Sequence, residues 1–140
     1  MTFKSHELDF MRQADLGRLA TIQPDGTPQN SPVGFVYNDE LGTIDIAGYR
    51  MSQSQKFRNV ARNNKVAFVI DDITSREPWR VRCLEIRGTA EQAEIPPSQG
   101  AAGDHLDTAI IRVTPRRIIS FGIDDQVSEP YLLEADRRDV

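Results

Sequence analysis

One segment of the chain is rich in basic side chains and free of acidic ones, although the protein as a whole is acidic. The 140 residues include 21 Asp and Glu against 17 Lys and Arg, which gives a formal net charge of -4. From residue 50 to residue 65 no Asp or Glu occurs, and the charged side chains are all cations: Arg50, Lys56, Arg58, Arg62 and Lys65. Carboxylates would repel a bound anion, so a segment without them favours a phosphate-binding site.

A helix is predicted in the middle of this segment, from Ser54 to Asn64. The stretch contains no Gly or Pro, and its apolar residues are spaced at i, i+3 and i+4: Phe57, Val60 and Ala61. Ser52 or Ser54 can cap its start. A helix N-terminus presents backbone N–H groups without intrahelical partners and a partial positive charge. Because Lys56 lies in the first turn, an anion bound at this end would be within its reach.

The cations of this segment have two different interpretations. We favour a phosphate contact for Lys56, with Arg50 close by just before the helix. Arg62 and Lys65 lie opposite the apolar face of the helix. For these two we favour ordinary solvated surface, since most charged residues of surface helices are solvated.

Composition excludes several other kinds of chemistry. Cys83 is the only cysteine, and His6 and His105 are widely separated in sequence, so neither a disulfide nor a recognisable zinc site is predicted. The sequence contains no Walker loop, no GxGxxG and no recognisable motif around a nucleophile. A pair of catalytic carboxylates stays open, although most acids lie in turns or in the tail, where a solvated role is more common.

The physical properties of the chain restrict where it is expected to act. Its longest apolar runs, such as Val66–Ile70, are far shorter than the roughly 20 residues that span a bilayer. No signal-like N-terminus is present, and a lone cysteine suits a reducing compartment, so we expect a soluble, cytoplasmic protein without a membrane partner. A pI near 5.2 argues against general nucleic-acid binding.

Hydrophobic alternation and turn residues predict a β-rich chain. The first fifty residues indicate a short helix and then a meander of three strands: Ser5–Gln13, Leu16–Ile22, Gln29–Tyr37 and Thr43–Ala47. After the second helix, a buried strand, a long strand and two final strands are predicted: Val66–Ile70, Trp79–Ala90, Thr108–Thr114 and Arg117–Ile123. The alternation of the long strand changes phase near Cys83 and Leu84, which indicates a β-bulge or burial of both faces.

The connections between these strands are predicted to be polar. Asp71–Pro78 is predicted to be a loop, and Pro115 and Arg116 are predicted to separate the last two strands. Ala93–Asp107 carries two Pro and two Gly and shows no regular periodicity.

These elements favour one mostly β domain. About seven strands in a largely antiparallel, hairpin-linked order, with two short helices, are most simply arranged as a small β-barrel, because closure removes exposed strand edges. A chain of this length supports one core. We therefore predict a single domain over residues 1–127 and a C-terminal tail over residues 128–140.

Three stretches of the sequence resemble a known family: "TPQNSPVGFVYN", "AGYRMSQSQKFRNVARNNKVAFVIDD" and "PWRVRCLEIRGTAE". Their order is similar to that of the pyridoxamine 5'-phosphate oxidase-like split β-barrel flavoproteins, and most similar to the branch described as F420-dependent oxidoreductases. The resemblance covers Leu8 to Ile123, and its most specific element is a Ser-x-Lys-x-x-Asn helix start followed by a valine-rich strand. It implies a split β-barrel of the FMN-binding type with six to seven strands.

The same resemblance implies a cofactor site. The phosphate of FMN, or of the deazaflavin coenzyme F420, would be held at the helix start by four residues: Lys56, Ser52, Ser54 and Gln55. The isoalloxazine-type ring would be backed by the strand-to-helix segment: Gly48, Tyr49, Arg50 and Met51. The second strand would supply the other wall of the ring site: Asn30, Ser31, Pro32 and Val33.

Sites of this family lie between the two subunits of a homodimer. By the resemblance, Trp79 and Arg80 would reach the cofactor of the partner chain, although plain dimer packing explains an interfacial Trp79 equally well. The oxidase itself grips FMN phosphate with basic residues on its second strand, whereas Gln29–Tyr37 has no Lys or Arg. F420 carries a phosphodiester and an acidic tail, for which extra cations such as Arg50, Arg58 or Arg80 would be useful. We therefore expect F420 as the cofactor, with FMN as the alternative.

The expected activity follows from the cofactor. We expect hydride transfer between reduced F420 and a small electron-poor organic molecule such as an enone, imine or quinone, with protonation by solvent or by Tyr49. No other catalytic residue and no metal are assigned. The alternatives are an FMN-dependent oxidoreductase of the same fold, a flavin-, F420- or haem-binding or storage protein without turnover, and a structural dimer with a vestigial site.

Overall fold

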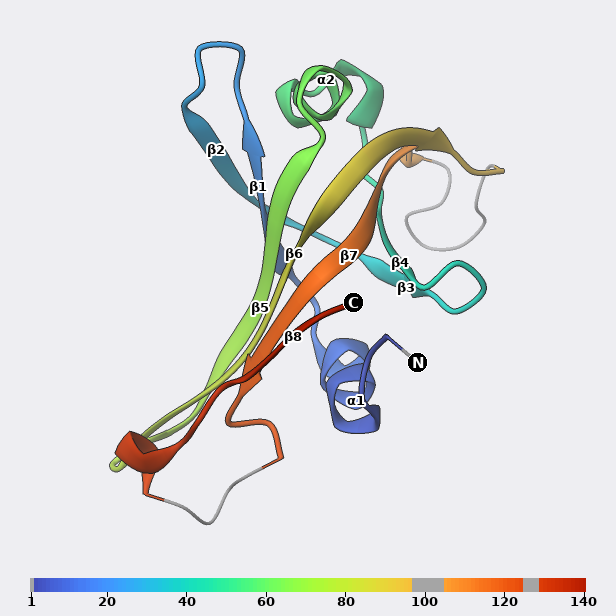
Figure 1. Cartoon of the computed structure of the whole chain (residues 1–140). Coiled ribbons are helices and arrows are strands. Elements are labelled where there is room, and N and C mark those ends of the chain that lie inside the picture. Colours follow the sequence, from blue (N-terminus) through green and yellow to red (C-terminus); the bar gives the residue numbers. More distant parts are fainter. Residues whose placement is uncertain (1, 97–104, 125–128) are drawn as a thin grey trace.

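The fold is built on three long antiparallel strands. β5 (Lys65–Arg76), β6 (Trp79–Glu94) and β7 (Ala109–Phe121) lie side by side along the length of the molecule (Figure 1). The other strands extend this sheet in the order β2-β1-β5-β6-β7-β4-β3, and β8 also pairs with β7. Every strand pairing is antiparallel.

The computed structural model describes residues 2–96, 105–124 and 129–140. The shorter elements in these ranges are α1 (Ser5–Gln13), β1 (Gly17–Ile22), β2 (Pro28–Val33), β3 (Val36–Asn38), β4 (Thr43–Ile46), the 3-10 helices η1 (Met51–Gln53) and η3 (Pro130–Leu132), α2 (Gln55–Arg62) and β8 (Asp136–Asp139). α2 lies at one end of the long strands, and the turn between β5 and β6 lies at the other (Figure 1). No helix in the described ranges has the length and hydropathy of a membrane-spanning segment.

The inward faces of the strands form one apolar core. Side chains alternate along a strand, and buried residues recur at every second position in the first half of β5 and around Leu84 and Ile86 of β6. β5 and β6 bury five large side chains: Val66, Phe68, Ile70, Leu84 and Ile86. β7 adds Ile110, Ile111, Val113, Ile118 and Ile119. Both helices contribute to the same core, through Leu8 and Met11 of α1 and Val60 of α2. The predicted mostly β, antiparallel architecture with two short helices is confirmed.

The prediction of a loop over Asp71–Pro78 is wrong, because β5 continues through most of this stretch. Its two aspartates are matched by arginines on the neighbouring strands. Arg18 of β1 donates a hydrogen bond to Asp71 at 3.2 Å, and Arg82 of β6 donates to Asp72 at 2.9 Å. The stretch is therefore polar because it carries cross-strand ion pairs. Its polar composition alone predicts a loop.

The prediction of two separate strands before residue 124 is also wrong. β7 is continuous and includes Pro115, which has no N–H to give to the ladder. Pro115 is tolerated because the register between β6 and β7 shifts between Arg87 and Gly88. No shift occurs near Cys83 and Leu84, where the sequence indicated a bulge, since β6 stays in register with both of its neighbours there.

Other element boundaries differ in smaller ways. The predicted strand Gln29–Tyr37 divides into β2, which pairs with β1, and β3, which pairs with β4. β6 runs past Ala90 to its end at Glu94, so only part of Ala93–Asp107 is irregular, and residues 97–104 lie outside the described residues. β8, which no sequence pattern predicted, adds the chain end to the sheet.

At the bulge, β6 and β7 approach so closely that only glycine fits at position 88. A Cβ atom on Gly88 would lie 2.1 Å from the carbonyl oxygen of Thr114 and 3.3 Å from the Cα of Pro115. Both are backbone atoms of a paired strand, so neither can move aside without breaking the ladder. The absence of a side chain at this position is therefore a requirement of the fold.

A buried ion pair joins the two ends of the chain. The carboxylate of Glu7 on α1 is fully buried, and Arg138 of β8 donates to both of its oxygens. The hydroxyl of Ser120 donates to it at 2.7 Å, and the backbone N–H of Lys4 at 2.8 Å. Burial by itself would raise the pKa of Glu7, but the hydrogen bonds from Arg138, Lys4 and Ser120 outweigh it and lower the pKa.

We expect Gly88→Ala to lower the free energy of unfolding by about 3 kcal/mol, because the added methyl group overlaps the backbone of β7. Urea denaturation measures this change. Gly34→Ala is the matched control, since a Cβ there meets no atom within 4 Å, and it should change the free energy by less than about 0.5 kcal/mol. Equal effects of the two variants would show that the close approach is not a constraint.

We also expect the Glu7 ion pair to make stability depend on pH. Because the folded pKa of Glu7 is lowered, its contribution is complete above the ordinary carboxyl pKa and is lost as the pH falls through the folded value. Glu7→Gln should cost about 3 kcal/mol at pH 7, and the difference from the unmodified protein should shrink in acid. Denaturation from pH 7 down to acid measures this, with the exposed Glu134→Gln as control. A difference that does not vary with pH contradicts the prediction.

Candidate functional site

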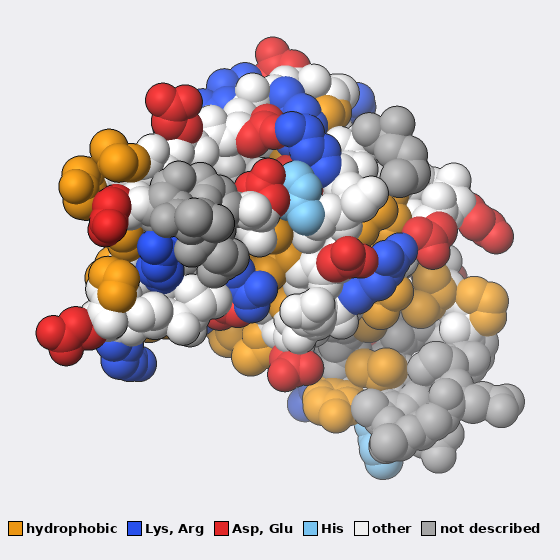
Figure 2. Space-filling view, turned by 90° about the horizontal axis from the view of Figure 1, so that it is seen from below, with side chains coloured by type: hydrophobic (Ala, Val, Ile, Leu, Met, Phe, Trp, Pro, Cys, Tyr) orange, Lys and Arg blue, Asp and Glu red, His pale blue; other side chains and the backbone are white. Residues whose placement is uncertain are grey.

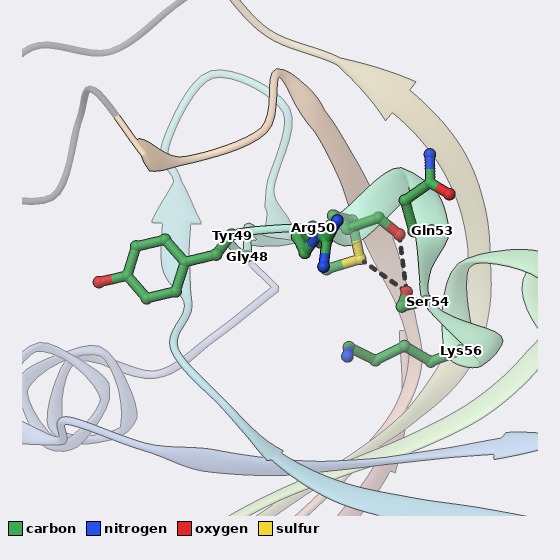
Figure 3. A pocket seen from close by; sticks show the side chains of 7 residues that line it. Gly48, Tyr49, Arg50, Gln53, Ser54 and Lys56 are labelled. Atoms are coloured by element: carbon green, nitrogen blue, oxygen red, sulfur yellow. Dashed lines mark hydrogen bonds between the residues drawn. The ribbon is translucent and has the colours of Figure 1, made fainter.

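An open pocket of about 530 Å³ lies where the chain passes from β4 to α2. Seven residues line it: Gly48, Tyr49, Arg50, Met51, Gln53, Ser54 and Lys56 (Figure 3). Two of these side chains are cations and none is an acid. The structure therefore brings most of the predicted phosphate and ring-backing residues together around one space.

The start of α2 is shaped by Ser54 and Met51. The Ser54 hydroxyl accepts the backbone N–H of Phe57 at 3.2 Å and donates to the carbonyl of Met51 at 2.7 Å (Figure 3), so it forms the N-cap of the helix. Met51 itself is 1% exposed and anchors η1 in the core. Ser54 thus shapes the pocket, and its hydroxyl is already committed to the protein.

Lys56 extends from the first turn of α2 into the pocket, on the side where Arg50 lies (Figure 3). Among the described residues its ammonium has no hydrogen-bond or ion-pair partner. The N–H groups of Gln55 and Lys56 belong to the first turn, where a helix offers no intrahelical acceptor. The ammonium of Lys56 and these first-turn N–H groups form a donor set that fits a phosphate group. The pocket lining includes no acid that would repel it.

A buried asparagine fixes the orientation of α2. Asn59 is fully buried, and its Nδ2 donates to Thr21 of β1 at 3.0 Å and to Gln29 of β2 at 3.2 Å. Its Oδ1 accepts from the side chain of Gln55 at 2.7 Å. These bonds hold the rotation of α2 about its axis, and with it the direction of Lys56. The sequence motif includes this asparagine, but sequence reasoning gave it no role.

Two of the predicted phosphate residues are engaged elsewhere. The side chain of Gln55 bonds to Asn59 and accepts from Arg58 at 2.9 Å. Ser52 does not line the pocket: its N–H donates to Asp107 at 2.9 Å, and its hydroxyl donates to the same carboxylate oxygen. The acid that reaches this segment therefore comes from a distant part of the chain. No local pattern marks Asp107, so the sequence did not reveal it.

The second strand lies outside the pocket within one chain. Asn30, Ser31, Pro32 and Val33 pair with β1, and none of them lines the pocket. Val33 belongs to the core, whereas Asn30 and Pro32 are exposed. Their role as a ring wall stays a prediction.

Trp79 and Arg80 lie far from the pocket, beside the turn between β5 and β6 at the opposite end of the sheet (Figure 1). Trp79 is 55% exposed, and its neighbours in the C-terminal segment are exposed as well: Tyr131 at 81% and Leu132 at 61%. Hydrophobic side chains are visible at this end of the molecule in Figure 2, on its left side. Trp79 and Tyr131 line one shallow pocket together with Pro130. One chain cannot bring these residues to its own α2.

Residues 3–122 match the family model of pyridoxamine 5'-phosphate oxidase. The chain belongs to this family. A relative from Streptomyces rimosus, a 5a,11a-dehydrotetracycline/5a,11a-dehydrooxytetracycline reductase, is 43% identical over 128 residues, which are 91% of this chain and 89% of the relative. The comparison supports an oxidoreductase in general terms.

Solved structures of the family share the fold. A conserved hypothetical protein from Mycobacterium tuberculosis superposes with a TM-score of 0.69 at 22% identity, over 92% of this chain and 93% of that one. An F420 reductase superposes with a TM-score of 0.59 at 25% identity, over 81% of this chain and 95% of its own. The split β-barrel that the sequence predicted is thereby confirmed.

Proposed function

We propose that the protein is an F420-dependent oxidoreductase that transfers hydride between reduced F420 and a small electron-poor organic substrate. The observation that carries this proposal is the pocket at the start of α2. There Lys56, which has no partner in the part of the chain that the structure describes, and the first-turn amides face lining residues that include no acid. Two similarities support it. A 43% identical relative is a reductase, and an F420 reductase has the same fold.

In this proposal the pocket residues bind and orient the cofactor. Lys56 and the amides at the start of α2 hold a phosphate oxygen by charge-assisted hydrogen bonds. The main chain of Gly48 lies along the ring site, and Arg50 is placed for the acidic tail. When bound, F420 supplies the hydride-transfer chemistry, and the protein supplies position and exclusion of water.

The substrate is proposed from the relative. The Streptomyces rimosus enzyme is a reductase of dehydrotetracyclines, so we propose an unsaturated, multi-ring substrate for this chain. Tyr49 lies on the pocket wall, is 64% exposed and has no partner among the described residues, which suits a proton donor. Solvent is the alternative donor.

We further propose that the working unit is a homodimer with a cofactor site in each half. The pocket is open and is lined from one short stretch of the chain, whereas Trp79 and Arg80 lie at the far end of the sheet. A second copy would bring these two residues over the ring. An exposed tryptophan is the kind of side chain that such an interface buries.

FMN in the same pocket is the nearest alternative, since its phosphate would meet the same groups. The absence of Lys and Arg from β2 favours F420. The alternative outside the enzymes is a protein that binds or stores the cofactor without turnover.

A difference titration of the purified protein against F420 and FMN separates the first two proposals. We expect tighter binding of F420, followed by oxidation of reduced F420 when a panel of cyclic enones is added. Tight binding of FMN with none of F420 would overturn the proposed cofactor. Binding of F420 without accelerated oxidation by any enone would favour storage.

Lys56→Ala should weaken F420 binding by about 1.5–3 kcal/mol, the value of a charge-assisted hydrogen bond to phosphate. The dissociation constant measured by fluorescence titration tests this. Lys65→Ala is the matched control, because Lys65 belongs to the same acid-free segment but is exposed at the start of β5 and does not line the pocket. An unchanged dissociation constant for Lys56→Ala contradicts the site.

Complementation tests the shared site. Light scattering of the unmodified protein should give twice the chain mass of 15.8 kDa. The Lys56→Ala and Trp79→Ala variants should each bind F420 poorly. After the two variants are mixed and subunits exchange, a mixed dimer has one pocket with both residues intact, so part of the binding should return. A monomeric mass, or no recovery in mixed dimers, contradicts the shared site.

A further inference from the structure

Asp107 contacts both ends of the segment that forms the pocket. Its backbone N–H donates to the carbonyl of Gly48 at 3.0 Å. Its Oδ2 accepts the N–H of Ser52 at 2.9 Å and also the Ser52 hydroxyl. The residues between these two contacts, Tyr49, Arg50 and Met51, all line the pocket. One residue thus spans the part of the wall that would back a ring.

The carboxylate of Asp107 is also tied to the central sheet. Its Oδ1 accepts the N–H of Ala109, the first residue of β7, at 3.1 Å. The hydrogen bonds from the side chain and backbone of Ser52, with that from Ala109, lower the pKa of Asp107. The group is therefore ionised at neutral pH, and its contacts are charge-assisted.

Residues 48–52 have few other connections. Residues 48–50 lie between β4 and η1 and belong to neither. Among the described residues, the remaining hydrogen bonds of residues 48–52 stay within η1 and the start of α2: Gln53 N–H to the Arg50 carbonyl, and Ser54 to Met51. Apart from the buried side chain of Met51, Asp107 is thus what ties this segment to the sheet.

We propose that Asp107 is a positioning residue for the cofactor site: it holds residues 48–52 in the conformation that forms the pocket wall. It contacts Gly48 and Ser52 and does not itself line the pocket, so it acts through the segment and not on the ligand. The inference rests on the proposed function, because the ligand is taken to be a phosphate-bearing cofactor.

Three single variants and one double variant test this role. Asp107→Ala removes the carboxylate and should raise the dissociation constant for F420 about tenfold, since charge-assisted hydrogen bonds are lost. Ser52→Ala removes one donor and should have a smaller effect in the same direction. Asp107→Asn keeps an acceptor oxygen and should recover part of the loss. Because both partners act through one contact, the double variant with Ala at both positions should bind no worse than Asp107→Ala.

The chain offers a matched control in the turn between β1 and β2. Asp25 accepts the N–H of Thr27 at 3.0 Å and its hydroxyl at 2.5 Å, the same pair of contacts that Asp107 makes with Ser52. Neither residue lines the pocket. Asp25→Ala therefore removes an equivalent interaction and should leave the dissociation constant unchanged.

Hydrogen exchange of the ligand-free protein supplies a readout that does not depend on the cofactor. Asp107→Ala should speed amide exchange in residues 48–53 while the core strands keep their protection. The proposal is overturned if Asp107→Ala binds F420 as Asp25→Ala does, or if exchange in residues 48–53 is unchanged. Should Asp107→Ala not fold, Ser52→Ala and Asp107→Asn carry the same comparison. If the unmodified protein binds neither F420 nor FMN, the proposed function fails, and the exchange result still decides the structural role.

Discussion

The close approach of Gly88 to the backbone of Thr114 is the constraint on which both halves of the molecule depend. It lets β6 and β7 pair on both sides of one bulge. On one side of the bulge, the first part of β7 pairs with β4. On the same side, Gln92 of β6 donates to the carbonyl of Phe57 in α2 at 2.9 Å. The other half carries β8 and, through it, the buried carboxylate of Glu7. The pairing of β6 with β7 therefore positions both the pocket and the contact between the two ends of the chain.

Charged residues serve these two halves in different ways. On the strands, acids are matched with arginines across the sheet, as with Asp45 and Arg112, whose side chains meet at 3.0 Å, or Asp72 and Arg82 at 2.9 Å. Such pairs satisfy partly buried carboxylates. At the start of α2 the opposite holds, since Lys56 has no acid to pair with among the described residues. A ligand phosphate would fill the position that a carboxylate fills on the strands.

Features that depend on local spacing could be predicted from the sequence, and features that depend on contacts between distant residues could not. The helix starting after Ser54 and the place of Lys56 in its first turn depend on spacing over a few residues, and both are found where predicted. The strand over residues 71–76 was missed because its polar side chains are explained by partners on other strands, such as Arg18. The continuity of β7 through Pro115 depends on a glycine in β6. Asp107 reaches Ser52 only through the fold, so no pattern near either residue could reveal the contact.

The change of phase that the sequence shows in the long strand is not a bulge, because β6 stays in register with both neighbours near Cys83 and Leu84. Leu84 and Ile86 face the core, whereas Trp79 and Val81 lie on the opposite face, and Trp79 is more than half exposed. Ile73 of β5 stands directly opposite Val81 and is 44% exposed. Apolar side chains on both parities of a strand indicate two apolar environments. The core is the first, and the C-terminal segment covers the second only in part, where Trp79 and Val81 line a pocket with Leu133. The dimer proposed above would complete the second, at the end of the sheet that its own pocket cannot reach.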